Sequence, residues 1–199
     1  MNQLYESLAN LLEYPDESWG ARLELGRQVV AIESPELAPA FSDFYREIES
    51  LNLGALQERY TQTFDLNPVC TLEVGYHLFG ENYKRGLFLA NLQETEAPFE
   101  LGQQNQLPDY LPVLLRLIVK LEDKELRDAL IAECLLPAIE KMLAALGQSE
   151  NPYTRLIETI HRALEMLAPE AARTAAADVS AMPELYRISS RAAKKEQRL

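Results

Sequence analysis

The chain has 199 residues, of which 47% are hydrophobic and 25% are charged, and its 31 acidic and 19 basic side chains give a formal net charge of −12. A chain of this length suits one domain and buries enough apolar surface to fold without disulfides or a structural metal. The negative charge argues against nucleic acid and anionic membranes as partners, because both would repel it, and it leaves cationic partners open.

The cysteines and the first residues bear on the compartment. Cys70 and Cys134 lie far apart in the sequence and form no Cys-x-x-Cys motif, which favours free thiols in a reducing environment. The first residues, MNQLYESLANLLEYP, have no basic flank and no long apolar core, so they lack the pattern of a signal peptide. No uncharged apolar stretch reaches the roughly 18 residues that a membrane span needs. We therefore expect a cytoplasmic protein that does not insert into a membrane.

Hydrophobic residues recur with helical spacing along most of the chain. In residues 2–13, Leu4, Leu8 and Leu11 fall on one helix face, and Pro15 ends the pattern. No run of alternating β-branched residues lies between turn signals, so we predict no sheet. The predicted helices span residues 2–13, 17–33, 36–50, 53–65, 71–79, 81–95, 109–121, 123–146 and 152–167, and a polar loop is expected at 97–107.

The segment QLPDYLPVLL, residues 106–115, leads into the most apolar of these helices. Apolar residues cover nearly the whole circumference of that helix, and Arg116 and Lys120 mark its polar edge, which is typical of a helix buried in a bundle. If Asp109 is the N-cap, its carboxylate accepts hydrogen bonds from the first turn, worth about 1 kcal/mol. Pro112 then falls at the third helical position, where the missing N–H has no partner within the helix.

These patterns predict an all-α protein: a single-domain helical bundle of about eight to ten helices around a central apolar helix. The helical domain is expected over residues 1–168. Residues 169–199 are Ala-rich and then basic, and 184–199 hold five Lys or Arg against two Glu, a net charge of +3. Such a tail buries little apolar surface, so we expect it to be mobile.

Residues that could carry catalysis are scarce. The chain has two histidines, His77 and His161. Glu158 and His161 have the Glu-x-x-His spacing that directs two metal ligands from one helix face, but a di-iron bundle needs that motif twice and two further glutamates. No dinucleotide fingerprint, phosphate loop or nucleophile elbow is present. The residues favour a binding protein with no catalytic residue, cofactor or metal, and a metal-dependent helical-bundle enzyme using Glu158 and His161 is the alternative from another class.

Three stretches of the chain resemble a known family in their order and spacing. They are YTQTFDL (60–66), YHLFGENYKRGLFLANL (76–92) and NQLPDYLPVLLRLI (105–118). Together they resemble the nitrate reductase assembly chaperones, the NarJ-type branch of the TorD/DmsD/NarJ family of redox-enzyme maturation proteins. The looser similarity extends over residues 1–168 and leaves the tail uncovered.

Two positions of the third stretch depart from the family pattern. Gln106 stands where an acidic residue is usual, and Arg116 stands where a glutamate is common in the following helix. These departures bear on which enzyme such a chaperone serves.

The resemblance implies a cytoplasmic, non-enzymatic helical chaperone. It would bind the N-terminal segment of a molybdoenzyme catalytic subunit, in the first place the alpha subunit of respiratory nitrate reductase. It would hold that subunit until the molybdenum cofactor and an iron–sulfur cluster are inserted, before docking at the membrane, with cofactor-insertion proteins as possible further partners. A basic amphipathic peptide in a groove between helices suits an acidic bundle. The alternative within the family is a chaperone of another DMSO-reductase-type enzyme.

The resemblance also implies which residues bind the peptide. Asp109 would face a basic or N–H-rich end of it, and Tyr110 and Tyr76 would present apolar faces with polar tips. His77 would make binding pH-sensitive near neutrality. The full set is Asp109, Tyr110 and Gln106 from the third stretch, Tyr76, His77, Phe79 and Arg85 from the second, and Tyr60 and Phe64 from the first. Plain core packing is the alternative for Tyr60, Phe64 and Phe79, and an ion pair with a neighbouring acid is the alternative for Arg85.

Overall fold

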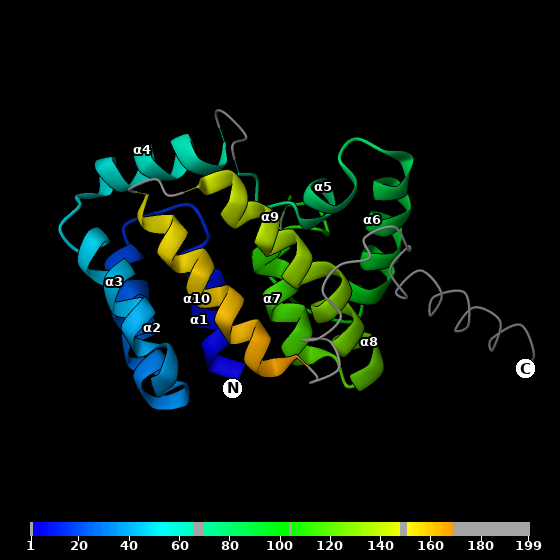
Figure 1. Cartoon of the computed structure of the whole chain (residues 1–199), viewed down its shortest axis with the longest axis horizontal. Coiled ribbons are helices and arrows are strands. Elements are labelled where there is room, and N and C mark those ends of the chain that lie inside the picture. The colour runs from blue at the N-terminus through cyan, green and yellow to red at the C-terminus, as the bar shows by residue number, and fades with distance from the viewer. Residues whose placement is uncertain (1, 66–69, 104, 148–150, 169–199) are drawn as a thin grey trace, which may run out of the picture.

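The structure, a computed structural model, describes residues 2–65, 70–103, 105–147 and 151–168. Within these ranges the chain is an all-α bundle, as predicted (Figure 1). Extended residues pair there only in an isolated antiparallel bridge between Glu73 and Tyr110. The predicted tail at 169–199 lies outside the described residues.

The helices follow the predicted segments closely. Helices α8 and α9 are joined by the π-helical η2 into one continuous helix, so the described part of the chain contains nine helices, within the predicted range. The elements are α1 (Asn2–Leu11), α2 (Trp19–Glu33), the short 3-10 helix η1 (Pro35–Leu37), α3 (Ala38–Ile48), α4 (Leu53–Phe64), α5 (Val74–Phe79), α6 (Tyr83–Glu96), α7 (Leu111–Lys120), α8 (Lys124–Ala129), η2 (Leu130–Leu135), α9 (Leu136–Leu146) and α10 (Pro152–Leu167).

Side-chain caps set the first residues of several helices. Asn52 accepts a hydrogen bond from the Ala55 N–H at the start of α4, at 3.0 Å, and Asn82 accepts one from the Lys84 N–H at the start of α6, at 3.1 Å. Each such cap stabilises its helix by about 1 kcal/mol. Helix α5 ends at Gly80, whose φ of 60° is a conformation that glycine adopts without strain, and the chain turns there into α6.

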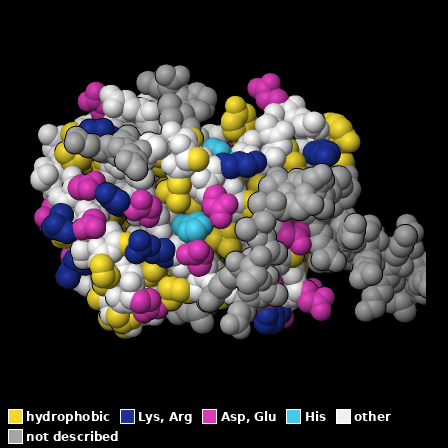
Figure 2. Space-filling model, viewed as in Figure 1, with side chains coloured by type: hydrophobic (Ala, Val, Ile, Leu, Met, Phe, Trp, Pro, Cys, Tyr) yellow, Lys and Arg dark blue, Asp and Glu magenta, His cyan; other side chains and the backbone are white. Residues whose placement is uncertain are grey.

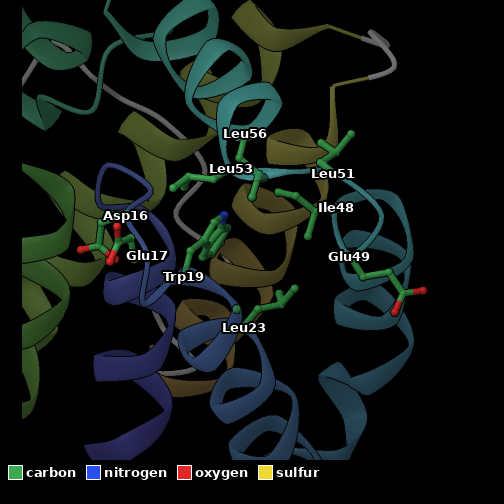
Figure 3. A pocket seen from close by; sticks show the side chains of 10 residues that line it. Asp16, Glu17, Trp19, Leu23, Ile48, Glu49, Leu51, Leu53 and Leu56 are labelled. Atoms are coloured by element: carbon green, nitrogen blue, oxygen red, sulfur yellow. The ribbon is translucent and has the colours of Figure 1, made fainter.

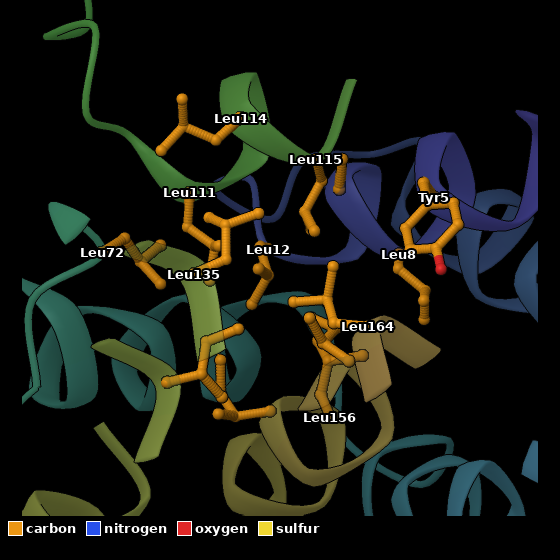
Figure 4. Packing of buried hydrophobic residues seen from close by; sticks show 14 of the residues in the cluster. Tyr5, Leu8, Leu12, Leu72, Leu111, Leu114, Leu115, Leu135, Leu156 and Leu164 are labelled. Carbon is orange, nitrogen blue, oxygen red and sulfur yellow. The ribbon is translucent and has the colours of Figure 1, made fainter. Parts of the chain in front are cut away.

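Helix α7 forms the centre of the core, which confirms the predicted central apolar helix. All its residues from Leu111 to Ile118 are buried. It packs on α1, while α10 packs on α3 and α9. In Figure 4, leucines of α7, α1 and α10 lie around one shared interior: Leu111, Leu114 and Leu115 from α7, Leu8 and Leu12 from α1 and the segment after it, and Leu156 and Leu164 from α10. One cluster of buried residues therefore serves the whole bundle.

Arg116 brings a positive charge into this central helix and is only 7% exposed. Its Nε donates to Glu6 Oε1 at 2.9 Å, and its Nη2 donates to Glu13 Oε1 at 2.6 Å and to Asn10 Oδ1 at 2.7 Å. Its Nη1 donates to the Leu101 carbonyl at 3.2 Å. One guanidinium thus fastens α7 to α1 and to the loop that precedes α7. A glutamate at this position would face two other acids, so the departure from the family pattern has a structural role here.

Cys70 and Cys134 are free and buried, and burial raises the pKa of both thiols, which makes them poor nucleophiles. None of the helices in the described ranges is long and apolar enough to cross a membrane.

Candidate functional site

The three stretches that carry the family resemblance meet at the start of α7. The Val74 N–H donates to the Asp109 carbonyl at 2.8 Å, and the Leu111 N–H donates to the Leu72 carbonyl at 2.9 Å. These bonds pair the residues that enter α5 with the residues that enter α7. From α4, the Tyr60 hydroxyl lies 3.3 Å from that of Tyr110.

The carboxylate of Asp109 is the centre of this arrangement and is fully buried. Its Oδ2 accepts hydrogen bonds from Arg85 Nε at 3.0 Å and from the Gly75 N–H at 3.1 Å, and its Oδ1 lies 3.5 Å from Arg85 Nη2. A Cβ at Gly75 would lie 2.7 Å from Oδ2, so the close approach requires glycine there. We refer to Asp109, Gly75 and Arg85 together as the Asp109 junction.

The structure corrects the predicted role of Asp109 as the N-cap of α7. That helix begins at Leu111, Tyr110 occupies its N-cap position without a side-chain cap, and Pro112 is the second helical residue rather than the third. Asp109 instead caps α5, because Gly75 is the second residue of that helix. Hydrogen bonds to a guanidinium are stronger than those to an amide, and this favours the orientation toward Arg85.

Three of the aromatic residues predicted at the site occupy the core. Tyr60, Phe64 and Tyr110 are all buried, at 5%, 6% and 8% exposure. The Tyr60 hydroxyl donates to the Leu12 carbonyl at 3.0 Å, and the Phe64 ring packs edge-on against Tyr153 with centroids 5.0 Å apart. Burial raises the pKa of Tyr110 to about 12. Contact of these residues with a peptide stays a prediction, and it would require the peptide to reach beneath the present surface.

Other predicted site residues lie nearer the surface. Tyr76 is 37% exposed, and the Arg85 guanidinium carbon lies 5.9 Å from its ring centroid. Phe79 is half-buried and packs edge-on against Phe88. Gln106 is exposed in the turn before α7. Arg85 forms an ion pair with Asp109, as the alternative interpretation of this residue predicted.

His77 is partly buried beside the residues that enter α5, and a pH dependence of peptide binding through this residue stays a prediction. Its Nε2 lies 2.8 Å from the Thr71 carbonyl, and burial lowers the pKa of the imidazole below its usual value. The lowered pKa favours the neutral ring over the charged one.

Two exposed residues of the second stretch were missed by sequence reasoning. Tyr83 is 74% exposed and Leu87 is 40% exposed. They lie four residues apart on α6 and so share one helix face, while Phe88 and Leu92 of the same helix are buried. The four-residue spacing of Tyr83 and Leu87, separate from that of Phe88 and Leu92, was the sequence signal for a second apolar face on this helix. We refer to Tyr76, Tyr83 and Leu87 as the α5–α6 surface.

Glu96 is a second buried acid near the Asp109 junction. It is 4% exposed, and its Oε1 accepts no hydrogen bond from any group that the structure describes. Burial raises the pKa of this carboxyl to about 7, and the Asp109 charge adds to the effect. The acid is therefore partly protonated in neutral solution.

The alternative metal site finds no ligand set in the described part of the chain. Glu158 pairs with Arg155 at 3.0 Å, and His161 Nδ1 lies 3.6 Å from Glu165 Oε2. No group of three or more His, Cys, Asp or Glu side chains among the described residues could hold a metal ion.

Fold and site together define an all-α bundle in which buried charges fix the helices, and the described residues form no assembled catalytic group. No family model matches the chain. It is 29% identical over 163 residues to the Probable nitrate reductase molybdenum cofactor assembly chaperone NarJ of Bacillus subtilis strain 168. The aligned region covers 81% of this chain and 88% of that protein.

Two proteins of Escherichia coli strain K12 are also similar. The nitrate reductase molybdenum cofactor assembly chaperone NarJ is 27% identical over 158 residues, and NarW, named as a probable chaperone of the same kind, is 27% identical over 163 residues. The matches cover 77% and 79% of this chain and 66% of each relative. The chain is thus a homologue of the nitrate reductase molybdenum cofactor assembly chaperones. These relatives are chaperones rather than enzymes, which supports the prediction of a non-enzyme.

We expect Asp109→Ala to lower the free energy of unfolding by about 3 kcal/mol, because removing one partner of a buried ion pair leaves the other uncompensated. Urea denaturation measures the change. Asp123→Ala is the matched control, since Asp123 caps α8 from an exposed position and its loss should cost only about 1 kcal/mol. Equal losses in the two variants would contradict the structural role given to Asp109.

We expect Glu96→Gln to become more stable relative to the unmodified protein as pH rises. The folded-state pKa of about 7 lies above the ordinary value of 4.5, so the stability that protonated Glu96 supplies is complete below pH 4.5 and lost as pH rises through 7. The difference amounts to at most about 3 kcal/mol. Urea denaturation at several pH values tests this, with exposed Glu94→Gln of the same helix as control. Parallel pH profiles for Glu96→Gln and the unmodified protein would refute it.

Proposed function

We propose that this protein is a cytoplasmic chaperone of nitrate reductase assembly. It binds the N-terminal segment of the molybdenum-containing catalytic subunit and holds that subunit for insertion of the molybdenum cofactor before docking at the membrane. The observation that carries the proposal is the sequence identity of 27–29% to nitrate reductase assembly chaperones over about four fifths of the chain.

The location of the shared stretches supports a binding role. They are brought together from residues 60 to 118 by the Asp109 junction and the contact between Tyr60 and Tyr110. Asp109 and Gly75 of the junction are buried and Arg85 is partly exposed, so the junction acts by positioning α5 and α6. The exposed apolar side chains in the second stretch, Tyr83 and Leu87, are then available to a peptide. We therefore assign direct contact to the α5–α6 surface and a supporting role to Asp109.

The charge of the chain supports a basic client segment. The net charge is −12. On the face shown in Figure 2, acidic and hydrophobic side chains are spread over the described surface, with basic side chains among them. Such a surface attracts a basic amphipathic segment and offers apolar contacts once it arrives. The attraction weakens as salt is added, which suits a complex that must later release its client.

The second candidate client is another enzyme of the DMSO-reductase family. Gln106 replaces the usual acid of the family pattern. It is exposed beside the half-exposed Leu107, so a client that contacts this turn would meet an amide where the family pattern has a carboxylate.

We expect a synthetic peptide of the cognate nitrate reductase alpha subunit's N-terminal segment to bind saturably in isothermal titration calorimetry and more weakly at higher salt. Replacing both Tyr83 and Leu87 by alanine should weaken binding about tenfold, equivalent to about 1.4 kcal/mol, because apolar anchors carry most of such an interface.

The matched control is the double variant Leu25→Ala and Ile32→Ala, which removes two exposed apolar side chains from α2, 51% and 79% exposed. It should bind as the unmodified protein does. A scrambled peptide that binds equally well would rule out specific recognition of the segment. Tighter binding of the equivalent segment from another DMSO-reductase-type enzyme would identify that enzyme as the client.

A further inference from the structure

A pocket lies at the end of the bundle where α2 begins, α3 ends and α4 begins. Its volume is about 350 Å³. Figure 3 shows the apolar side chains of these elements lying toward one another, with Asp16 and Glu17 on one side and Glu49 on the opposite side. None of the residues in the three family-like stretches lines it. Its lining is Asp16, Glu17, Trp19, Gly20, Leu23, Ile48, Glu49, Leu51, Leu53 and Leu56.

The pocket combines an apolar interior with an acidic rim. Trp19, Leu23 and Ile48 are buried and line it. The half-buried Leu51, from the α3–α4 connection, and Leu53, the first residue of α4, also line it. Glu17 and Glu49 are exposed at the rim, and no ion pair with a described residue engages either carboxylate. The third acid, Asp16, is already bound by Ser18 and Arg22.

Trp19 provides a second, independent sign of a ligand. Its side chain is nearly fully buried, at 2% exposure, yet no described protein group accepts a hydrogen bond from its Nε1–H. In Figure 3 its ring nitrogen lies at the end of the indole nearest Leu53 and Leu56, the α4 side of the pocket. A buried donor without an acceptor is unfavourable, and a backbone carbonyl of a bound segment would supply one.

The size of the pocket restricts its occupant. Sites for small molecules and cofactors usually have volumes of about 300–1,000 Å³, so this pocket lies at the lower limit. It suits one bulky side chain of a protein segment, in the manner of the anchor residues that dominate interfaces. The exposed acids Glu17 and Glu49 at its rim suit lysine or arginine residues on either side of that anchor.

We propose that this pocket holds a bulky apolar side chain of the client's N-terminal segment, with basic residues of the segment on either side of it, one toward Glu17 and one toward Glu49. The inference rests on the proposed function and adds a second contact to it. Helix α4 links the two places, since Leu53 and Leu56 line the pocket and Tyr60 contacts Tyr110 beside the Asp109 junction. Its 12 residues span about 18 Å, a distance that a short peptide covers.

Trp19 makes the pocket directly observable, because it is the single tryptophan of the chain. Titration with the alpha-subunit N-terminal peptide, prepared without tryptophan, should change the Trp19 emission saturably. The midpoint should equal the Kd measured by calorimetry on the same samples.

Gly20 allows the pocket to be blocked. It lies on the pocket wall, and a Cβ there meets no atom within 4 Å. Gly20→Phe should weaken peptide binding at least tenfold, and Gly20→Ala, which leaves the pocket open, should bind normally. The pair Glu17→Lys and Glu49→Lys should also weaken binding, whereas Glu100→Lys with Glu122→Lys, the same change of charge outside the pocket, should have a smaller effect.

The outcomes separate the two proposals. If the peptide binds in calorimetry while Trp19 emission stays constant and Gly20→Phe binds normally, the pocket is not a client site and the proposed function stands. If the peptide does not bind at all, the proposed function fails and this inference fails with it. If Gly20→Ala weakens binding as much as Gly20→Phe, occupancy of the pocket is ruled out as the cause.

Discussion

The carboxylate of Asp109 lies in the interior of the protein with an ion pair to Arg85 and a hydrogen bond from the Gly75 N–H, and the positions of α5 and α6 depend on it. A buried charge is costly unless such partners are present, so these three residues must be placed together or the segment is destabilised. Because Asp109 lies two residues before the first residue of α7, the junction joins the α5–α6 surface to the centre of the core. The surface that we assign to the client is therefore held by a rigid element.

Two arginines direct their charge inward in this acidic protein. Arg85 serves the Asp109 junction, and Arg116 fastens α1 to α7. Their positive charges are used within the fold, while acids such as Glu17 and Glu49 stay at the surface. The net charge of the chain is −12, and this favours encounter with a basic segment. The arginines thus stabilise the fold, and the excess of acidic residues attracts the client.

Helix positions and the central apolar helix could be predicted from the sequence because their signals are local spacing and caps. The role of Asp109 could not, since its partners lie 24 and 34 residues away and a local cap was the simpler interpretation. Tyr83 and Leu87 could not be identified from the sequence, because helical spacing alone does not tell which apolar side chains of α6 meet the core and which stay exposed. The pocket beside Trp19 was also invisible, because its walls come from three helices that only the tertiary structure brings together.

The account depends on the claim that Asp109 positions α5 and α6 rather than contacting the client. Amide hydrogen exchange by mass spectrometry, comparing the unmodified protein with Asp109→Asn, tests this most directly, since local opening is seen separately from global unfolding. Exchange should accelerate most in residues 74–96, with smaller changes in α1 and α10. An unchanged pattern, or equal acceleration throughout the bundle, would contradict the account.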